Sequence, residues 1–311
     1  MIRNLLLSLA LASPAGAFDL AFPAACTLGD SCYIQQYADH DPGPGAQDFT
    51  CGTLSYQGHD GTDIALPDRA AMAAGVNVLA AAPGTVLGTR DGIADFAPVI
   101  PGKDCGNGVV IDHAGGWQTQ YCHMKQGTVS VHMGDSVTTG TVLGQIGQSG
   151  AAAFPHLHLT LRHDGTTVDP FAPDRLNSCG DSGAELWSPS IAYHPGGLIR
   201  TGITSEIPEY DAIKSGLSSP DLPVTAPALV VWAFLYGSQT GDIVDFTLTG
   251  PEGAVLAEQV TLEKPQAQLF RAVGRKRKAE AWPAGAYQAT TSLIRKGQTI
   301  GSETVAIRVS P

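Results

Sequence analysis

The segment His59-Asp60-Gly61-Thr62-Asp63 places an imidazole and a carboxylate four residues apart. Both side chains are good zinc ligands. On a fully extended strand the two residues would lie roughly 13 Å apart, too far to share one ion. Gly61 can adopt backbone angles that other residues avoid, so we expect the chain to bend there and bring both donors to one metal. Taken alone, the spacing is equally compatible with a histidine beside an aspartate on a surface turn.

A second pair of histidines, His156 and His158, has the spacing of a β-strand face. Alternate residues of a strand point to the same side, so both imidazoles would face one way. Two buried histidines without partners would be unfavourable, whereas a metal bound by one and a reacting group hydrogen-bonded to the other would satisfy both. An exposed edge strand is the alternative. The apolar residues around the pair, at Phe154 and from Leu159 onward, favour a buried strand.

A further histidine, His123, lies near the end of an apolar run that follows two consecutive glycines at 115 and 116. The glycines predict a hairpin turn. A register that pairs Asp112 with Trp117 brings Cys105 within two residues of the position opposite Cys122, and a disulfide there would brace the strand that carries His123. A single histidine of this kind is more often structural than catalytic.

The first residues have the pattern of a secretory signal peptide. Arg3 supplies the positive charge, residues 5–12 the apolar core, and Ala15-Gly16-Ala17 a cleavage site. The apolar core is shorter than the roughly 20 residues of a membrane span, and we expect no such span in the mature chain. We therefore expect cleavage after Ala17 and a periplasmic or secreted protein that starts at Phe18.

An even number of cysteines in an exported chain favours disulfides, although sequence alone does not choose among the many pairings. Proximity suggests Cys26–Cys32, the hairpin suggests Cys105–Cys122, and Cys51–Cys179 is then the remainder. The sequence has no C-x-x-C motif, which argues against zinc bound by sulfur.

Strands predominate among the elements that would position these residues. Between residues 57 and 173 short apolar runs alternate with turn residues, at 76–82, 85–89, 109–111, 119–123, 129–131, 142–146 and 156–161. Only residues 68–74 have helical composition. The pattern predicts an all-β, antiparallel core.

The rest of the chain divides around this core. We expect a signal peptide at 1–17, an irregular disulfide-stapled extension at 18–55, the β core at 56–175, a Pro/Gly/Ser-rich connector with little regular structure at 176–226, and a small β-sandwich at 227–311. The sandwich strands are expected at 229–235, 243–249, 255–261, 287–293 and 303–309.

Net charge argues against one class of function, and the remaining basic residues and histidines are expected at the surface or in loops. The chain has 29 acidic and 18 basic residues, a formal net charge of −11, which argues against nucleic-acid binding. The basic run at 275–278 is expected at a hairpin tip, with an anionic envelope surface as an alternative partner. His40 is expected in a loop stabilised by an Asx turn; an inhibitory fourth metal ligand is the alternative. Surface positions are expected for His113, His132, His163 and His194.

Residues from about 56 to 173 resemble the lysostaphin/LytM-type family of zinc endopeptidases, which cut peptide bonds in bacterial peptidoglycan. The resemblance rests on four segments in the family's order: HDGTD at 59–63, CGNGVVIDHAGGWQTQYCHM at 105–124, GDSVTTGTVLGQIGQSG at 134–150 and HLHL at 156–159. It implies an antiparallel β core with a metal in a groove.

By this resemblance the zinc ligands are His59, Asp63 and His158, holding one Zn²⁺ per chain, and the catalytic histidines are His123 and His156. Three protein ligands leave one tetrahedral position open, as in catalytic zinc sites. Degenerate members of the family typically lack several of these residues. The resemblance therefore implies a zinc endopeptidase acting on peptidoglycan peptide stems. We expect this enzyme to be exported, as the signal-like N-terminus indicates, and monomeric.

Two other classes of protein compete with this interpretation. A non-catalytic cell-wall-binding or regulatory LytM-like protein would keep the fold. A biotinyl- or lipoyl-like carrier would share the glycine pattern of residues 134–150, but that segment has no lysine at a hairpin tip for attachment. A carrier would also leave the histidines unexplained.

Overall fold

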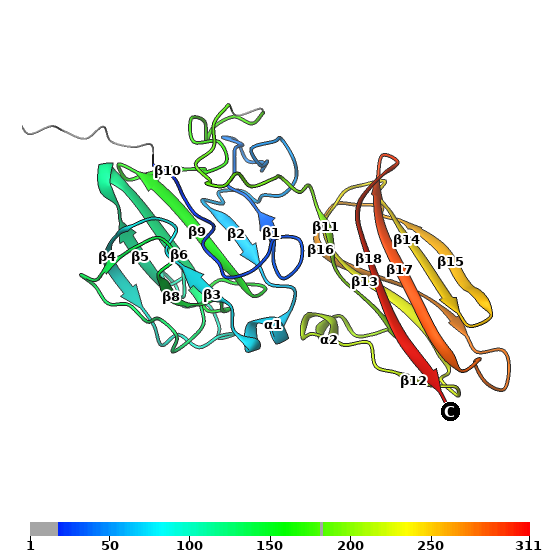
Figure 1. Cartoon of the computed structure of the whole chain (residues 1–311). Helices are drawn as coiled ribbons and strands as arrows, with labels where there is room; N and C mark the ends of the chain where they lie inside the picture. The colour runs from blue at the N-terminus through cyan, green and yellow to red at the C-terminus, as the bar shows by residue number, and fades with distance from the viewer. Residues whose placement is uncertain (1–17, 181–182) are drawn as a thin grey trace, which may run out of the picture.

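The computed structural model describes residues 18–180 and 183–311 (Figure 1). The predicted signal peptide, residues 1–17, lies outside the described residues. The described part is almost all β, and its strands pair antiparallel with one short exception near the C-terminus. The prediction of an antiparallel all-β fold is confirmed. Both α-helices in this part of the chain are too short to cross a membrane.

The first structural unit is built on a large sheet with the strand order β1-β2-β9-β6-β5-β4-β7, in which β10 also pairs with β9. Its strands are β1 (Tyr33–Gln36), β2 (Thr62–Ala65), β4 (Gly84–Arg90), β5 (Asn107–Asp112), β6 (Trp117–Met124), β7 (Ser136–Val137), β9 (His156–His163) and β10 (Thr166–Val168). A small sheet of β3 (Asn77–Leu79) and β8 (Val142–Gln145) shares the same hydrophobic core. Helix α1 (Arg69–Ala74) begins after Asp68, whose side chain accepts a hydrogen bond from the third residue along.

Strand β9 shows how the sequence positions the polar residues. Leu157, Leu159 and Leu161 have no exposed surface and lie in the hydrophobic core. His156 and His158 alternate with them, so their imidazoles project from the opposite face of the strand. Strand β9 lies between β2 and β6 in the sheet, and both histidines are buried as well.

Two strand predictions in this unit are wrong. The extension at 18–55 is expected to be irregular, but β1 forms there because β2 offers an edge for antiparallel pairing: Ile34 lies opposite Ile64. Residues 129–131 are expected to form a strand, but they lie in a loop. In that loop the amide of Ser130 donates one hydrogen bond to the carbonyl of Leu143.

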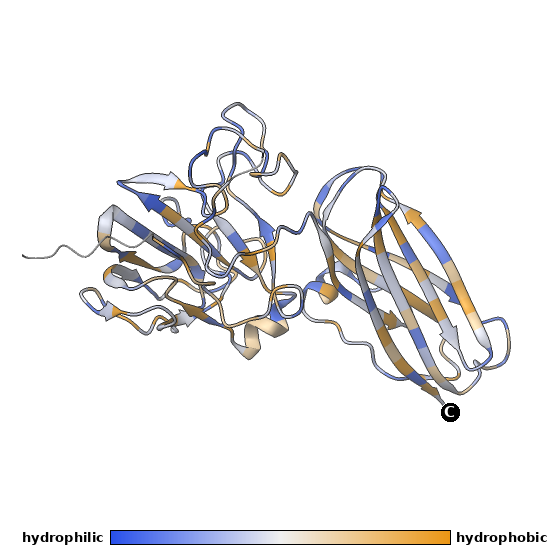
Figure 2. Ribbon diagram, turned by 45° about the horizontal axis from the view of Figure 1, so that its top comes forward, coloured by the Kyte–Doolittle hydropathy of each residue, from blue (hydrophilic) through white to orange (hydrophobic). Residues whose placement is uncertain are grey.

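Residues 197–311 form two further sheets that pack as a sandwich (Figure 1). One sheet has the order β11-β13-β16 and the other β12-β18-β17-β14-β15. The strands are β11 (Gly197–Thr204), β12 (Leu222–Pro223), β13 (Ala228–Ser238), β14 (Ile243–Gly250), β15 (Gly253–Thr261), β16 (Gln266–Lys276), β17 (Gly285–Arg295) and β18 (Gln298–Ser310). Hydrophobic and hydrophilic residues alternate along several of them, and the apolar faces form one core (Figure 2).

The connector at 176–226 is more ordered than its composition predicts. Strand β11 belongs to the sandwich because it pairs along its length with β13, and helix α2 (Tyr210–Lys214) follows it. The strand β16 is also absent from the prediction. Its last two residues begin the basic run, which therefore straddles the end of a strand and does not form a hairpin tip.

Three disulfides are present: Cys26–Cys32, Cys51–Cys179 and Cys105–Cys122. These are the pairs suggested by the sequence. The predicted hairpin register is wrong by one residue, because Asp112 pairs with Gln118 and not with its neighbour. The turn uses only residues 114–116, and the amide of His113 donates to the carbonyl of Trp117. A β-bulge near the start of β5 then shifts the register again, and Cys105 lies close enough to Cys122 in β6 to form the disulfide.

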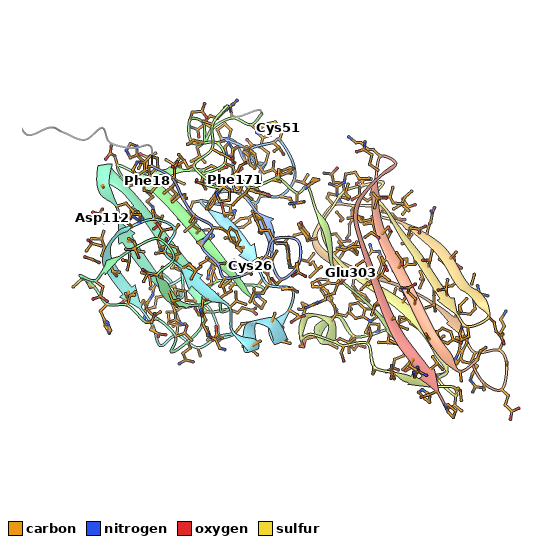
Figure 3. The ribbon with its side chains drawn as sticks, viewed as in Figure 1. Phe18, Cys26, Cys51, Asp112, Phe171 and Glu303 are labelled. Carbon is orange, nitrogen blue, oxygen red and sulfur yellow. A yellow bond between two sulfur atoms is a disulfide. The ribbon has the colours of Figure 1, made fainter. Side chains whose placement is uncertain are left out.

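The loop after β1 is fastened to the segment that follows β10. His40 is fully buried, with Nε2 2.7 Å from Asp169 Oδ2 and Nδ1 3.0 Å from the carbonyl oxygen of Ser178. The disulfide Cys51–Cys179 joins the same two segments, and the ring of Phe171 stacks on that of Phe49 across them, with ring centroids 5.1 Å apart (Figure 3 labels Phe171 and Cys51). Both nitrogens of His40 are thus engaged, so the alternative of an inhibitory metal ligand is wrong.

The His40–Asp169 pair predicts a pH-dependent contribution to stability. Burial alone would lower the pKa of His40, but the hydrogen bonds to Asp169 and Ser178 outweigh it and raise the pKa above its usual value. A raised pKa stabilises the fold fully below the unfolded-state value of about 6.5, and this stabilisation is lost as pH rises through the folded-state value. We expect His40→Gln to lower the free energy of unfolding by about 3 kcal/mol at pH 5.5, and by less at pH 9. Chemical denaturation with the disulfides intact measures both, and an equal loss at the two pH values would contradict the assignment.

Candidate metal centre

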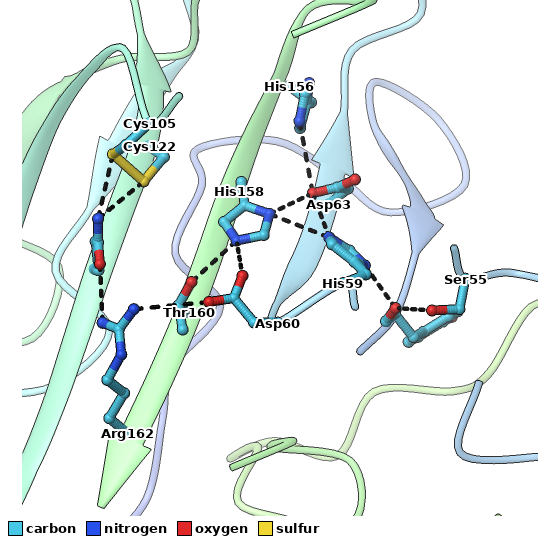
Figure 4. Close-up of polar contacts among 12 residues, drawn as sticks. Ser55, His59, Asp60, Asp63, Cys105, Cys122, His156, His158, Thr160 and Arg162 are labelled. Atoms are coloured by element: carbon cyan, nitrogen blue, oxygen red, sulfur yellow. Dashed lines mark hydrogen bonds and ion pairs between the residues drawn. A yellow bond between two sulfur atoms is a disulfide. The ribbon is translucent and has the colours of Figure 1, made fainter. Parts of the chain in front are cut away.

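His59, Asp63 and His158 bring three metal-binding atoms together (Figure 4). His59 Nε2 lies 3.1 Å from His158 Nδ1 and 3.2 Å from Asp63 Oδ1, and these last two atoms are 2.9 Å apart. Tetrahedral zinc ligands, at about 2.0–2.1 Å from the ion, lie about 3.3 Å from one another. All three side chains are buried. Two imidazoles and a carboxylate at these separations fit a zinc-type site, and no other such group occurs among residues 18–180 and 183–311.

The register of β2 and β9 sets two of these donors side by side, because Asp63 pairs directly with His158. His59 precedes β2 in a turn, in which its amide donates to the carbonyl of Tyr56. The predicted role of Gly61 is wrong, since its backbone does not use the left-handed region. A Cβ at this position would lie 2.5 Å from the backbone oxygen of Leu159 and 2.7 Å from His158 Nε2. The glycine therefore provides space for the ligand ring.

We expect Gly61→Ala to weaken metal binding by at least about tenfold. The added methyl group meets a backbone oxygen that is held by the β2–β9 pairing, so the His158 ring has to shift. Overpacking of this kind typically costs about 1–3 kcal/mol, and about 1.4 kcal/mol corresponds to a tenfold change in affinity. Competition with a chromogenic chelator measures the affinity. Gly88→Ala in β4 is the control, since its Cβ would have no neighbour within 4 Å; equal affinities in the two variants would refute the steric explanation.

The N-terminal extension orients the imidazole of His59. Its Nδ1 lies 2.7 Å from the carbonyl oxygen of Tyr37, which also accepts a hydrogen bond from the hydroxyl of Ser55 at 3.0 Å (Figure 4). A histidine that donates Nδ1–H to a carbonyl presents Nε2 as the metal-binding atom. The ring of Tyr56 stacks on the imidazole. No sequence pattern pointed to this contribution, because a backbone carbonyl carries no sequence signal.

The electrostatics of the three donors favour a cation. Burial alone would raise the pKa of Asp63, but the surrounding histidines, His59 and His156 first, hold it well below its usual value. Burial alone would lower the pKa of His158, but hydrogen bonds to Asp60 and Asp63 outweigh it and raise the pKa to about 9. The anionic carboxylate of Asp63 thus lies beside imidazoles, and the local charge stabilises a bound cation.

His123 and His156 lie beside this group. Their ring centroids are 4.6 Å apart, and that of His123 is 5.9 Å from His158. Nδ1 of His123 contacts the carbonyl of Ser149 at 2.8 Å, and Nδ1 of His156 contacts that of Phe154 at 2.8 Å. Burial, with a smaller effect of the neighbouring histidines, lowers the pKa of His123 to about 3, and burial also lowers that of His156. Both rings are therefore neutral near pH 7.

His123 has a left-handed backbone, with φ of 63°. This conformation is uncommon for a residue other than glycine and concentrates at functional sites. It occurs where the bulge interrupts the pairing of β5 with β6, and the amide of His123 donates to the carbonyl of Cys105. The disulfide from that cysteine to Cys122 thus braces the strained residue.

Among the histidines predicted at the surface, His113 is buried. Its Nδ1 lies 2.8 Å from the carbonyl oxygen of Pro83 and its Nε2 lies 2.8 Å from the hydroxyl of Thr119. The side chain of His132, in contrast, is 88% exposed. The turn beside His113 suggested exposure, but the neighbouring segment that ends at Pro83 covers the ring.

The family model described as Peptidase family M23 matches residues 57–170. The cell division protein DipM of Caulobacter vibrioides is 35% identical over 100 residues, which cover 32% of this chain and 16% of DipM. The DD-carboxypeptidase/endopeptidase Mpg of Neisseria meningitidis is 36% identical over 85 residues, which cover 27% of this chain and 19% of Mpg.

The peptidoglycan DD-endopeptidase ShyA of Vibrio cholerae is 32% identical over 111 residues, which cover 36% of this chain and 22% of ShyA. The chain therefore matches less than a quarter of the length of each of these relatives. The five predicted site residues all lie within the matched region: His59, Asp63, His123, His156 and His158. Residues 57–170 are thus identified as a domain of peptidase family M23.

Proposed function

We propose that this chain is an exported, zinc-dependent endopeptidase that hydrolyses peptide cross-links of bacterial peptidoglycan. The observation that carries the proposal is the meeting of three metal donors with two neutral histidines. The names of two relatives, a peptidoglycan DD-endopeptidase and a DD-carboxypeptidase/endopeptidase, support the substrate class. Three disulfides and the signal-like pattern of residues 1–17 support export.

His59 Nε2, Asp63 Oδ1 and His158 Nδ1 would hold the zinc ion. A zinc ion in such a site supplies a water of lowered pKa and polarises the carbonyl of a bound peptide. The remaining tetrahedral position is open in a three-ligand site, which is typical of catalytic zinc.

His123 and His156 would move the protons. Each donates Nδ1–H to a backbone carbonyl, a tautomer that leaves Nε2 as an acceptor. A neutral Nε2 accepts a proton from the attacking water, and the resulting imidazolium donates it to the leaving amine. The second ring would hydrogen-bond the substrate once it is bound. The sandwich at 197–311 would serve as an accessory unit for docking on the cell wall.

The proposal is tested by digesting purified peptidoglycan with the mature protein and separating the fragments. We expect new amine and carboxyl ends from cleaved peptide cross-links, loss of cleavage after zinc is removed with a chelator, and recovery when zinc is returned. Binding of the peptidoglycan without cleavage by a folded, zinc-loaded sample would overturn the enzymatic proposal. That result would favour the non-catalytic regulator.

A further inference from the structure

Asp60 is the one acidic residue of the HDGTD segment that the metal site does not use. Its side chain is 49% exposed, and its Oδ1 lies 3.2 Å from His158 Nε2 (Figure 4). The other nitrogen of the same ring, Nδ1, faces Asp63 at 2.9 Å. The two carboxylates thus lie at opposite edges of one imidazole: Asp63 faces Nδ1, the proposed metal-binding nitrogen, and Asp60 faces Nε2.

A chain of polar contacts holds Asp60 in this position (Figure 4). Its Oδ2 pairs with Arg162 Nη2 at 3.7 Å, and Arg162 Nη1 donates to Gln120 Oε1 at 2.8 Å. The amide of Gln120 in turn lies 3.4 Å from each sulfur of the Cys105–Cys122 disulfide. Arg162 and Gln120 lie on the paired strands β9 and β6, so the support comes from the sheet that carries His158.

The chemistry of metal-binding histidines gives this contact a role. Such a histidine usually donates its second N–H to a carboxylate or a carbonyl, which fixes the tautomer and the ring orientation and raises the basicity of the ligand nitrogen. His59 has such a partner in the carbonyl of Tyr37. We propose that Asp60 is the corresponding positioning residue for His158, so that one five-residue segment supplies two metal ligands and the carboxylate that orients the third. The inference rests on the proposed zinc site.

Thr160 is the competing partner for the same nitrogen. Its hydroxyl lies 2.9 Å from His158 Nε2, and it follows two residues later on the same face of β9. A hydroxyl orients a ring but carries no charge, whereas a carboxylate also increases the basicity of the ligand. Replacing each partner separately therefore distinguishes an electrostatic role of Asp60 from simple orientation by Thr160.

The experiment compares the zinc affinities of the full mature chain and three variants by competition with a chromogenic chelator. We expect Asp60→Asn to bind zinc about 10–100-fold more weakly than the parent, the range for partners of metal ligands, and Thr160→Val to lose less. Asp112→Asn, at the exposed end of β5 (Figure 3), is the matched control for the lost charge and should bind like the parent. In the zinc-loaded parent the proton on His158 Nε2 should give a protected downfield NMR resonance that moves in Asp60→Asn.

The outcomes separate this inference from the proposed function. A folded parent that binds no zinc overturns both. Stoichiometric zinc in the parent, with Asp60→Asn equal to Asp112→Asn in affinity and an unmoved Nε2–H resonance, overturns the role of Asp60 alone. Thermal unfolding of the metal-free proteins is measured beside the affinities, and a weaker affinity in a variant that is still folded reports on the site and not on the fold.

Discussion

Replacing His158 with alanine is expected to abolish both zinc binding and peptidoglycan hydrolysis. The substitution removes one of three donors and leaves Asp63 with one fewer hydrogen bond in a buried site. Loss of a residue that only hydrogen-bonds a metal ligand weakens metal binding about 10–100-fold. Removal of a ligand itself should therefore weaken zinc binding by more than about 100-fold. Without the ion the reaction has no activated water at neutral pH, and hydrolysis should fall to the background of the assay.

The fold should survive this substitution. His158 projects from the face of β9 opposite the leucines of the hydrophobic core, and three disulfides restrain the unfolded chain. His132→Ala is the control, because it removes an imidazole whose side chain is 88% exposed. Zinc content by elemental analysis and fragment release from peptidoglycan are the two measurements. One equivalent of zinc in a folded His158→Ala protein would show that the ligand assignment is wrong.

Strands that show an alternation of apolar and polar residues could be predicted from the sequence. In β9 the alternation of leucine and histidine defines a buried strand with two polar residues on one face, and the structure places them so. The fold class follows from many short runs of this kind. Strands β1 and β11 could not be recognised, because their stability comes from distant partners. β11 contains two glycines, and the ring of Trp232 lies over one of them, Gly202.

The candidate site, like the fold, could be predicted only in part. The resemblance to the family, and not the spacing of any one motif, predicts that His59, Asp63 and His158 meet, and the structure brings their donor atoms together. It does not predict why they meet: Gly61 provides space, where the sequence suggested a bend. Nor does it indicate that Asp60, an apparent spacer in the motif, faces the ligand ring. Contacts across strands depend on register, and the hairpin shows that a register estimated from glycines alone can be wrong by one residue.

Replacing His123 is expected to leave zinc in place and to lower kcat by about 10²–10⁴-fold, the usual contribution of a general acid or base. The ring is near the metal donors but is not one of them. Asparagine is the suitable replacement, because it tolerates the left-handed backbone better than alanine does. We expect the same pattern for His156→Gln. If both histidines act only after the peptide is bound, kcat and kcat/KM should fall together with KM almost unchanged.

The control for this prediction is His132→Ala, which removes an exposed histidine outside the site and should leave kcat unchanged. The discriminating result is the combination of full zinc content with lost turnover. A His123→Asn protein that retains the parent's kcat would exclude the ring from proton transfer, and one that loses zinc would make it part of the metal site. Because the pKa of His123 is lowered to about 3 by burial and by its neighbours, the ring is neutral across the range of the assay. A loss of turnover that is the same at pH 6 and pH 8 is therefore the result that assigns the neutral imidazole as the proton acceptor.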